Sequence, residues 1–315
     1  MSRSTELESK SAATADLTLK SALQLLAHRE QRVRPQLDDK ILTDWNGLMV
    51  SALARAGQAL DRDDYVAAAA KAADFLLTRL RDNKGRLLHR YRGGRAGIMA
   101  TVDDYAFFVA GLLDLYEATF SASYLQTALE LNGQLLEYFW DDEAGGFFFT
   151  ADDGEALLVR SKEIYDGAVP SGNSVAAMNL IRLGRTTSDP DLEGRAAAIG
   201  KTFARKVAQS PTAFTQLLSA VAFAVGPSYE VVIAGEPGSA DADAMLAALR
   251  RSYHPNKVVL FHPQGDGQAE IARLAPFVAN QTSLDGKATA YVCRNYACKA
   301  PTTEVAVMLA ALDGE

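Results

Sequence analysis

Acidic side chains stand at the beginning of three stretches whose apolar pattern is typical of buried helices, at residues 43–47, 101–105 and 165–173. Each stretch also carries an aromatic ring or an amide. Carboxylates held close together can exchange protons with a glycosidic oxygen, and aromatic rings with amides can hold a sugar ring. The candidate catalytic residues are therefore Asp44, Asp103, Asp104, Glu163 and Asp166. The candidate substrate-binding residues are Lys40, Trp45, Asn46, His89, Arg90, Tyr91, Tyr105, Tyr165 and Asn173.

Structural alternatives for these residues stay open. The helix dipole stabilises an acid in the first turn by about 0.3–1 kcal/mol, so capping alone could explain any one of the aspartates. Lys40 and Lys162 lie next to acids and are equally consistent with salt bridges that brace loops, and His89 with a structural role in a strand. No histidine pair has the spacing of metal ligands, and the turn at residues 235–239 lacks the Gly-Lys-Ser/Thr ending of a phosphate-binding loop. We therefore expect neither a metal site nor a bound cofactor.

The elements that must position these residues are helices. Apolar residues recur every three to four positions through residues 14–226 and predict about eight helices. Helices starting near Asp44, Asp103 and Ser171 are apolar on most faces and rich in Gly and Ala, whereas those between them have a charged outer stripe. The buried starts recur after roughly 60 to 70 residues, which is typical of stacked helical hairpins. We predict a mainly α protein, a partial (α/α)6 toroid of about four hairpins, with the starts of its inner helices in one funnel.

The pattern changes after Gly226 and Pro227. A strand at 230–235, a helix at 241–251 and a strand at 257–261 predict a right-handed βαβ unit with parallel strands, followed by a strand at 288–293 and a helix at 304–312. The predicted domains are a flexible N-terminus (1–13), a helical-hairpin part (14–226) and a small α/β unit (227–315). Between the helices we expect a strand at 85–94 and a β-hairpin that turns at residues 153–154.

The composition of the chain argues against several kinds of partner and against a membrane protein. The net charge is −7, from 32 basic and 39 acidic residues, which argues against nucleic acid or an anionic membrane as partner. No apolar run reaches the roughly 18 residues of a membrane span, and the N-terminus lacks the apolar core of a signal peptide. Cys293 and Cys298 are the two cysteines and lack the spacing of a redox Cys-x-x-Cys motif. We expect structural or incidental cysteines, no disulfide framework and a cytoplasmic location.

Four sequence blocks carry a resemblance to a known family. They are residues 34–49, containing DDKILTDWNGLM, residues 103–120, starting DDYAFF, residues 165–177, YDGAVPSGNSVAA, and residues 285–293, DGKATAYVC. In this order they resemble the C-terminal part of the thioredoxin-domain-containing proteins similar to spermatogenesis-associated protein 20. The resemblance implies a thioredoxin-like domain followed by a toroid similar to six-hairpin glycosidases and N-acylglucosamine 2-epimerases.

Two functions follow from this resemblance and from the acids. The first is a carbohydrate-binding or sugar-processing protein, glycosidase-like or 2-epimerase-like, with a sugar as ligand. The second is a non-catalytic scaffold that acts with a thioredoxin-like domain or partner in redox or protein handling. A third hypothesis, a nucleotide-binding C-terminal module, is supported by the βαβ unit alone. Since the sequence shows neither the thioredoxin-like domain nor the first hairpins, we expect a truncated or split chain whose missing toroid half could come from another chain.

Overall fold

The computed structural model describes residues 3–314 and divides into two compact units between Lys40 and Ile41. Within the described part of the first unit, residues 3–40, the one regular element is the long helix α1 (Arg3–Glu30). The predicted first helix is therefore present, and the leucines of its apolar stripe are exposed: Leu17, Leu19, Leu23, Leu25 and Leu26. The flexible N-terminus predicted for residues 1–13 includes Met1 and Ser2, which lie outside the described residues, and stays a prediction.

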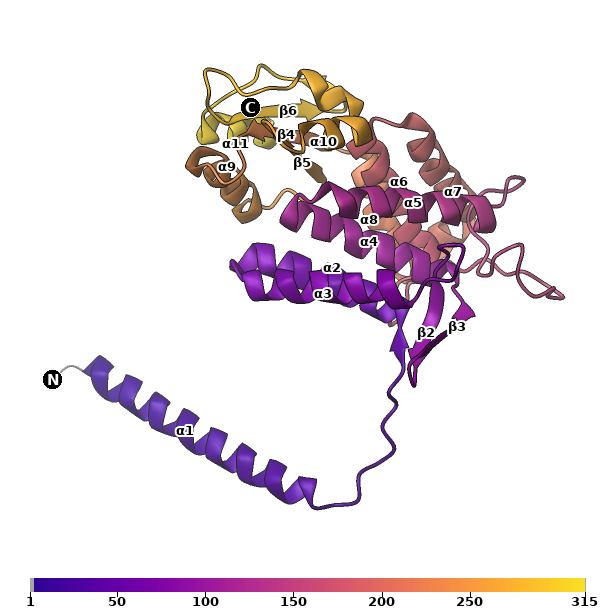
Figure 1. Ribbon diagram of the computed structural model, residues 1–315, viewed down its shortest axis with the longest axis vertical. Helices are drawn as coiled ribbons and strands as arrows, with labels where there is room; N and C mark the ends of the chain where they lie inside the picture. The colour runs from indigo at the N-terminus through magenta and orange to yellow at the C-terminus, as the bar shows by residue number, and fades with distance from the viewer. Residues whose placement is uncertain (1–2, 315) are drawn as a thin grey trace. The chain divides into compact units, whose positions relative to one another are not determined.

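The second unit begins with a layered arrangement of helical hairpins (Figure 1). The hairpins are α2 (Thr43–Leu60) with α3 (Asp63–Arg79), α4 (Val102–Thr119) with α5 (Ala122–Phe139), and α6 (Gly172–Thr187) with α7 (Pro190–Gln209). A 3-10 turn, η1 (Pro211–Ala213), leads to α8 (Thr215–Val225). Helices α2, α4, α6 and α8 pack side by side in chain order, and α3, α5 and α7 each pack on their own partner. Residues 41–225 thus form three hairpins and one further inner helix, which confirms the mainly α prediction and its partial toroid of hairpins.

Close backbone contact explains why the inner helices are rich in glycine. A Cβ atom on Gly47 of α2 would lie 2.6 Å from the backbone nitrogen of Phe108 in α4. A Cβ atom on Gly111 of α4 would lie 2.7 Å from the carbonyl oxygen of Gly47. Helix α4 is covered by neighbours on most faces, and Phe107, Phe108 and Leu112 are fully buried. The two glycines therefore let the N-terminal half of α2 approach the middle of α4 closely.

A small antiparallel sheet covers the start of α2. Strands β1 (Ile41–Leu42), β2 (Leu88–Arg92) and β3 (Arg95–Met99) lie in the order β1-β2-β3. The strand predicted at 85–94 is the first half of this β2–β3 hairpin, which turns at Gly93 and Gly94 with positive φ at both residues. In the register of the sheet, Leu42 of β1 lies opposite Arg90 of β2. The sheet thus places His89 beside the N-terminus of α2.

The β-hairpin predicted around residues 153–154 was wrong. Between residues 141 and 171 the structure has no strand, although one isolated bridge joins Phe147 to Trp140. The backbone N–H of Phe147 donates to the side chain of Asn173 at 2.7 Å, and its carbonyl accepts from the same amide at 2.9 Å. The Arg160 side chain donates to the carbonyl of Thr150. Side chains from elsewhere therefore satisfy backbone groups that a hairpin would have paired.

The C-terminal part contains a four-stranded sheet with the order β5-β4-β6-β7. Its elements are β4 (Tyr229–Gly235), α9 (Ala240–Arg251), β5 (Lys257–Pro263), α10 (Gln268–Leu274), η2 (Pro276–Asn280), β6 (Thr289–Arg294), β7 (Ala297–Cys298) and α11 (Val305–Asp313). Strand β4 runs parallel to β5 and antiparallel to β6. The predicted βαβ unit, the strand near 288–293 and the closing helix are therefore confirmed.

Strand β4 is buried along its whole length because both of its faces are covered. Val231 and Ile233 pack in a core with α9 and α11, whereas Val232 packs in the core of the helical hairpins. The boundary predicted near Pro227 consequently falls inside one compact unit of residues 41–315.

The two cysteines form a disulfide bond, Cys293–Cys298. They are paired residues of β6 and β7, so the bond closes one local turn. The prediction of structural or incidental cysteines did not include this bond. No helix in the described part of the chain is long and apolar enough to cross a membrane.

Candidate functional site

Carboxylates connect the beginnings of the inner helices. Asp104 of α4 accepts a hydrogen bond from the backbone N–H of Asp44 in α2 at 3.0 Å. The neighbouring Asp103 accepts one from the backbone N–H of Gly172, the first residue of α6. Asp166, before α6, accepts the N–H of Gln216 in the first turn of α8 at 2.9 Å. The helix starts that carry the candidate acids are therefore joined, each to the next.

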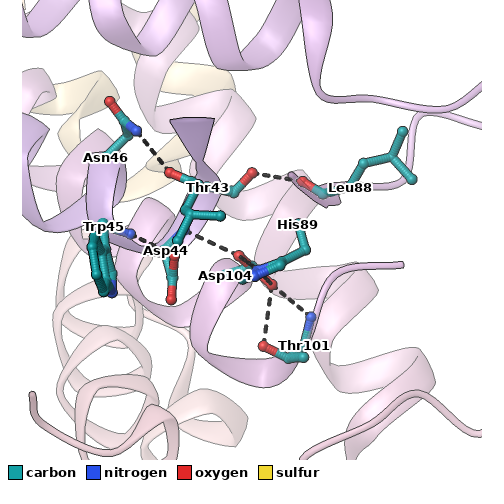
Figure 2. A network of polar contacts seen from close by, with 9 residues as sticks. Thr43, Asp44, Trp45, Asn46, Leu88, His89, Thr101 and Asp104 are labelled. Atoms are coloured by element: carbon teal, nitrogen blue, oxygen red, sulfur yellow. Dashed lines mark hydrogen bonds and ion pairs between the residues drawn. The ribbon is translucent and has the colours of Figure 1, made fainter. Parts of the chain in front are cut away.

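Asp104 lies at the centre of a polar network (Figure 2). It is fully buried, and its carboxylate accepts hydrogen bonds from the backbone N–H of Thr101 at 2.8 Å and from the Thr101 hydroxyl at 3.1 Å. Nδ1 of His89 lies 2.9 Å from Oδ1 and 3.1 Å from Oδ2 of the same carboxylate. The Thr43 hydroxyl donates to the carbonyl of Leu88 at 2.6 Å and so ties β2 to α2. His89 is thereby held by its strand and oriented by Asp104.

We call Asp44, His89, Asp103 and Asp104 the acid cluster, and the pKa values of Asp44, His89 and Asp103 are shifted. Burial, together with the negative charges of Asp104 and Asp44, raises the pKa of Asp103 to about 6 against the opposing effect of the Gly172 N–H. Burial and then the charge of Asp104 raise the pKa of Asp44. The hydrogen bond with Asp104 raises the pKa of His89. Asp103 is therefore the carboxyl group of the cluster whose pKa lies closest to neutral pH.

Three residues of this cluster could also offer ligands to a metal ion. One ligand atom each from Asp44, His89 and Asp104 lies within 4.8 Å of the others. The Asp104 carboxylate, however, already accepts hydrogen bonds from Thr101, Asp44 and His89. A cation at this place would have to compete with these bonds for the carboxylate oxygens of Asp104, and the expectation that the protein has no metal site stays a prediction.

Three other candidates have their polar groups occupied within the protein. Asp166 accepts backbone N–H groups from Ser171, Gln216 and Leu217. The Asn173 amide is hydrogen-bonded to the backbone of Phe147 and of Glu163. Tyr105 is fully buried, with its hydroxyl between the Leu87 N–H and the Gln134 side chain. These contacts hold the three side chains in place, and the catalytic role predicted for Asp166 and the substrate contacts predicted for Asn173 and Tyr105 stay predictions.

The remaining aromatic candidates differ in exposure. Trp45 follows Asp44 on α2, is 62% exposed, and its backbone N–H donates to Asp44 Oδ1 at 2.7 Å (Figure 2). Tyr165 is also exposed. Tyr91 instead packs edge-on against Phe75 of α3. Trp45 is therefore the aromatic candidate that combines an exposed ring with a place in the network of Figure 2.

The remaining polar candidates also differ in their exposure and in their hydrogen-bond partners. The Asn46 amide donates to the carbonyl of Leu42 at 2.7 Å. The side chain of Glu163 is exposed, and its charge contributes to the raised pKa of Asp103. Arg90 Nε is buried without a hydrogen-bond partner in the described part of the chain. Lys40 belongs to the N-terminal unit, where its Nζ pairs with Asp38 at 3.2 Å.

Sequence reasoning missed the part played by Thr101. Its hydroxyl and backbone N–H both bind the carboxylate of Asp104, three residues later. A Thr followed at this spacing by an acid is the sequence signal of a capping box. That signal was present in the sequence and identifies Asp104 as a capping residue, but it does not reveal the contacts of Asp104 with His89 and Asp44.

The comparison with curated proteins identifies relatives over most of the chain. No protein-family model matches it. Spermatogenesis-associated protein 20 of Homo sapiens is 36% identical over 290 residues, which are 89% of this chain and 37% of that protein. An uncharacterised protein of Caenorhabditis elegans is 29% identical over 286 residues, 88% of this chain and 38% of that protein. The resemblance drawn from the four sequence blocks is confirmed, and the chain spans 37% of the length of its human relative.

Similar solved structures include two sugar enzymes. The cellobiose 2-epimerase of Bacillus thermoamylovorans has a TM-score of 0.47 and 15% identity, covering 84% of this chain and 68% of that one. A GH76 α-mannanase of Bacteroides thetaiotaomicron has a TM-score of 0.46 and 20% identity, covering 55% of this chain and 47% of that one. The similarities are distant, and the fold described above rests on the packing of the hairpins themselves.

Proposed function

We propose that this homologue of spermatogenesis-associated protein 20 binds or processes a carbohydrate at the acid cluster. One observation carries the proposal. Asp103, whose pKa burial raises to about 6, lies next to a buried Asp104 that orients His89, at the joined starts of α2 and α4. A group that is part protonated near neutral pH, together with an oriented imidazole, is the equipment of general acid and base catalysis.

The protons of the cluster have distinct tasks in this proposal. Asp103 would donate a proton to a sugar oxygen and regain it from water. His89 would exchange its proton through Nε2, while the buried carboxylate of Asp104 stabilises the imidazolium through Nδ1. Asp44 would hydrogen-bond hydroxyl groups, since its carboxylate is half-buried and one of its oxygens accepts the Trp45 N–H.

The exposed ring of Trp45 supports the choice of a sugar as ligand. A sugar ring has an apolar face of C–H groups that stacks on an indole, and a rim of hydroxyls that bind carboxylates. Trp45 directly follows Asp44, so both kinds of contact come from the first turn of α2. Hydrolysis of a glycosidic bond and epimerisation beside a carbonyl group both begin with proton transfer, so the cluster is consistent with either reaction.

Product analysis tests this proposal. Purified protein would be incubated with neutral monosaccharides and oligosaccharides, and new reducing ends and new epimers would be followed by NMR. We expect one such product, and its formation to fall at least 100-fold in Asp103→Asn and in His89→Gln. The matched control is Asp142→Asn, because the Asp142 side chain is 91% exposed. Equal rates in Asp103→Asn and Asp142→Asn would remove the acid cluster from the reaction.

The disulfide favours the second candidate function, a scaffold that acts with a thioredoxin-like domain or partner. Cys298 is exposed, and an exposed disulfide is the kind of group that a thioredoxin-like protein reduces. The test incubates the protein with a thioredoxin-like protein whose resolving cysteine has been removed. A mixed disulfide at Cys293 or Cys298 would support the scaffold, and no trapping would count against it. The cytoplasmic location predicted from composition is a further proposal, to be tested by cell fractionation.

A further inference from the structure

A cavity of about 460 Å³ lies along the inner helices away from the acid cluster. Its walls include Arg55 and Gln58 of α2, Asp114 and Glu117 of α4, Arg182 of α6, and Lys257 at the start of β5. Asp114 is ten residues after Asp104 on α4, which places it about 15 Å further along the helix. The cavity is therefore distinct from the proposed sugar site.

A nearly buried ion-pair network forms one wall of the cavity. Arg182 binds Asp114 at 2.9 Å and Glu117 at 3.1 Å, and the side chains of Arg182 and Asp114 are 13% and 7% exposed. Asp114 also accepts the Ser51 hydroxyl at 2.5 Å. Burying three charges between helices that are otherwise apolar is costly, and an apolar set of similar volume would pack there without that cost. The charges therefore point to a use beyond holding the helices together.

Cations are in excess around the cavity. Four Arg or Lys side chains line it, Arg55, Arg182, Arg250 and Lys257, against the two carboxylates of Asp114 and Glu117. Burial lowers the pKa of Lys257, the charge of Glu117 opposes this effect, and the charge of Arg55 makes a smaller contribution that lowers the pKa. The ammonium of Lys257 and the exposed guanidinium of Arg55 therefore lie near enough to interact, and one bound anion could pair with both.

Helix capping explains only part of this positive charge. Arg250 donates to the carbonyl of Ala118 at 3.1 Å, near the C-terminus of α4, where cations are stabilised by the helix dipole. Lys257 donates one hydrogen bond to the carbonyl of His254 at 3.1 Å, which leaves two of its three ammonium protons. The amides of Gln58 and Gln216 line the same cavity and offer neutral hydrogen-bonding groups.

We propose that this cavity binds a small hydroxylated organic anion, with its carboxylate or phosphate at Arg55 and Lys257 and its hydroxyl groups at Gln58 and Gln216. The site stands apart from the proposed carbohydrate reaction and does not depend on it. Such an anion would occupy the cavity and pair with its excess positive charge.

Calorimetric titrations at constant ionic strength test the site with three probes: gluconate as carboxylate, glucose 6-phosphate as phosphate, and neutral glucose. We expect saturable binding of at least one anion by the intact chain. Arg55→Gln and Lys257→Gln should each weaken it at least tenfold. Glu117→Gln, which removes a negative charge but keeps an oxygen for Arg182, should strengthen it several-fold. Arg251→Gln removes an exposed cation outside the cavity lining and should leave binding unchanged, as should Asp103→Asn.

Two results would overturn the inference. One is the absence of saturable binding for both anions in the wild-type chain. The other is an affinity in Lys257→Gln equal to that in Arg251→Gln, since a general effect of net charge would act on both variants alike. The opposite sign expected for Glu117→Gln separates a charged site from damage to the fold, because damage would weaken binding in every variant.

Discussion

The carboxylate of Asp104 lies 2.9 Å from Nδ1 of His89 and has no exposed surface of its own. A buried carboxylate in this position fixes the ring of the histidine and stabilises its charged form. The same carboxylate accepts the backbone N–H of Asp44, so it also connects α4 to α2. Asp104 therefore joins the architecture of the hairpins to the chemistry of the acid cluster.

Replacing Asp104 should affect both stability and His89. In Asp104→Asn the amide can no longer accept every hydrogen bond from Thr101, Asp44 and His89, and we expect a loss of about 2–4 kcal/mol in the free energy of unfolding. The pKa of His89 should fall, because the hydrogen bond with Asp104 is the main cause of its raised value. Urea unfolding measures the first effect and NMR titration of the His89 ring the second. An unchanged His89 pKa would show that the pair does not interact in solution.

Asp103 should make stability depend on pH in a defined direction. Its pKa is raised to about 6 in the folded protein, so the folded state binds this proton more tightly than the unfolded state. Stability should therefore fall as the pH rises from about 4 to about 6 and stay level above that. Asp103→Asn removes this effect and should be more stable than wild type by about 1–3 kcal/mol at pH 8, with little difference at pH 4.

The control for this prediction is Asp142→Asn, whose exposed side chain should give wild-type stability at both pH values. Unfolding in urea at pH 4, 6 and 8 supplies the measurement. A difference between Asp103→Asn and wild type that stays constant with pH would contradict the raised pKa.

Asp166 should behave as a structural residue. It accepts backbone N–H groups at the start of α8 and one from Ser171. Asp166→Ala should cost about 1–2 kcal/mol, in the range of a lost helix cap, and Asp166→Asn less, since the amide keeps one acceptor oxygen. Both variants should keep the affinity for any sugar that the protein binds. Calorimetry measures the affinity and urea unfolding the stability. A loss of affinity without a loss of stability would show that Asp166 contacts the sugar.

The contact between α2 and α4 gives a packing prediction with an internal control. A Cβ atom on Gly47 would lie 2.6 Å from the Phe108 nitrogen, so Gly47→Ala should lower the free energy of unfolding by about 2 kcal/mol or more. Gly133 on α5 has nothing within 4 Å of a Cβ atom, and Gly133→Ala should stabilise by about 0.5–1 kcal/mol. Thermal unfolding of both variants measures these two changes in stability. Equal effects of the two substitutions would mean that the helices do not approach as described.

Much of the fold could be predicted because its signals are local. The 3.6-residue period located the helices, and the Gly- and Ala-rich character of α2 and α4 marked them as inner helices, for which Gly47 and Gly111 supply the physical reason. The βαβ unit followed from its apolar strands. The prediction for the region 145–160 was wrong because Phe147 is bonded by Asn173, which lies 26 residues later, and no local pattern reveals such a partner.

The candidate site was predictable as a set of acids but not as a set of roles. The sequence placed Asp44, Asp103 and Asp104 at helix starts, yet only the hydrogen bonds separate Asp104, which orients His89, from Asp166, which caps α8. Tyr105 was chosen as an aromatic ring and is fully buried. The cavity lined by Arg55, Arg182 and Lys257 was missed, although Asp114 and Arg182 interrupt apolar helices. The disulfide was missed because β7 is too short to show as a strand.

The most direct test of the carbohydrate proposal is a calorimetric titration of neutral sugars into the wild-type chain and three variants. We predict saturable binding of at least one sugar by the wild type, at least tenfold weaker binding in Trp45→Ala and in His89→Gln, and wild-type affinity in Asp142→Asn. Binding that is as tight in Trp45→Ala and His89→Gln as in Asp142→Asn, or no binding of any sugar to the wild type, would contradict the proposal.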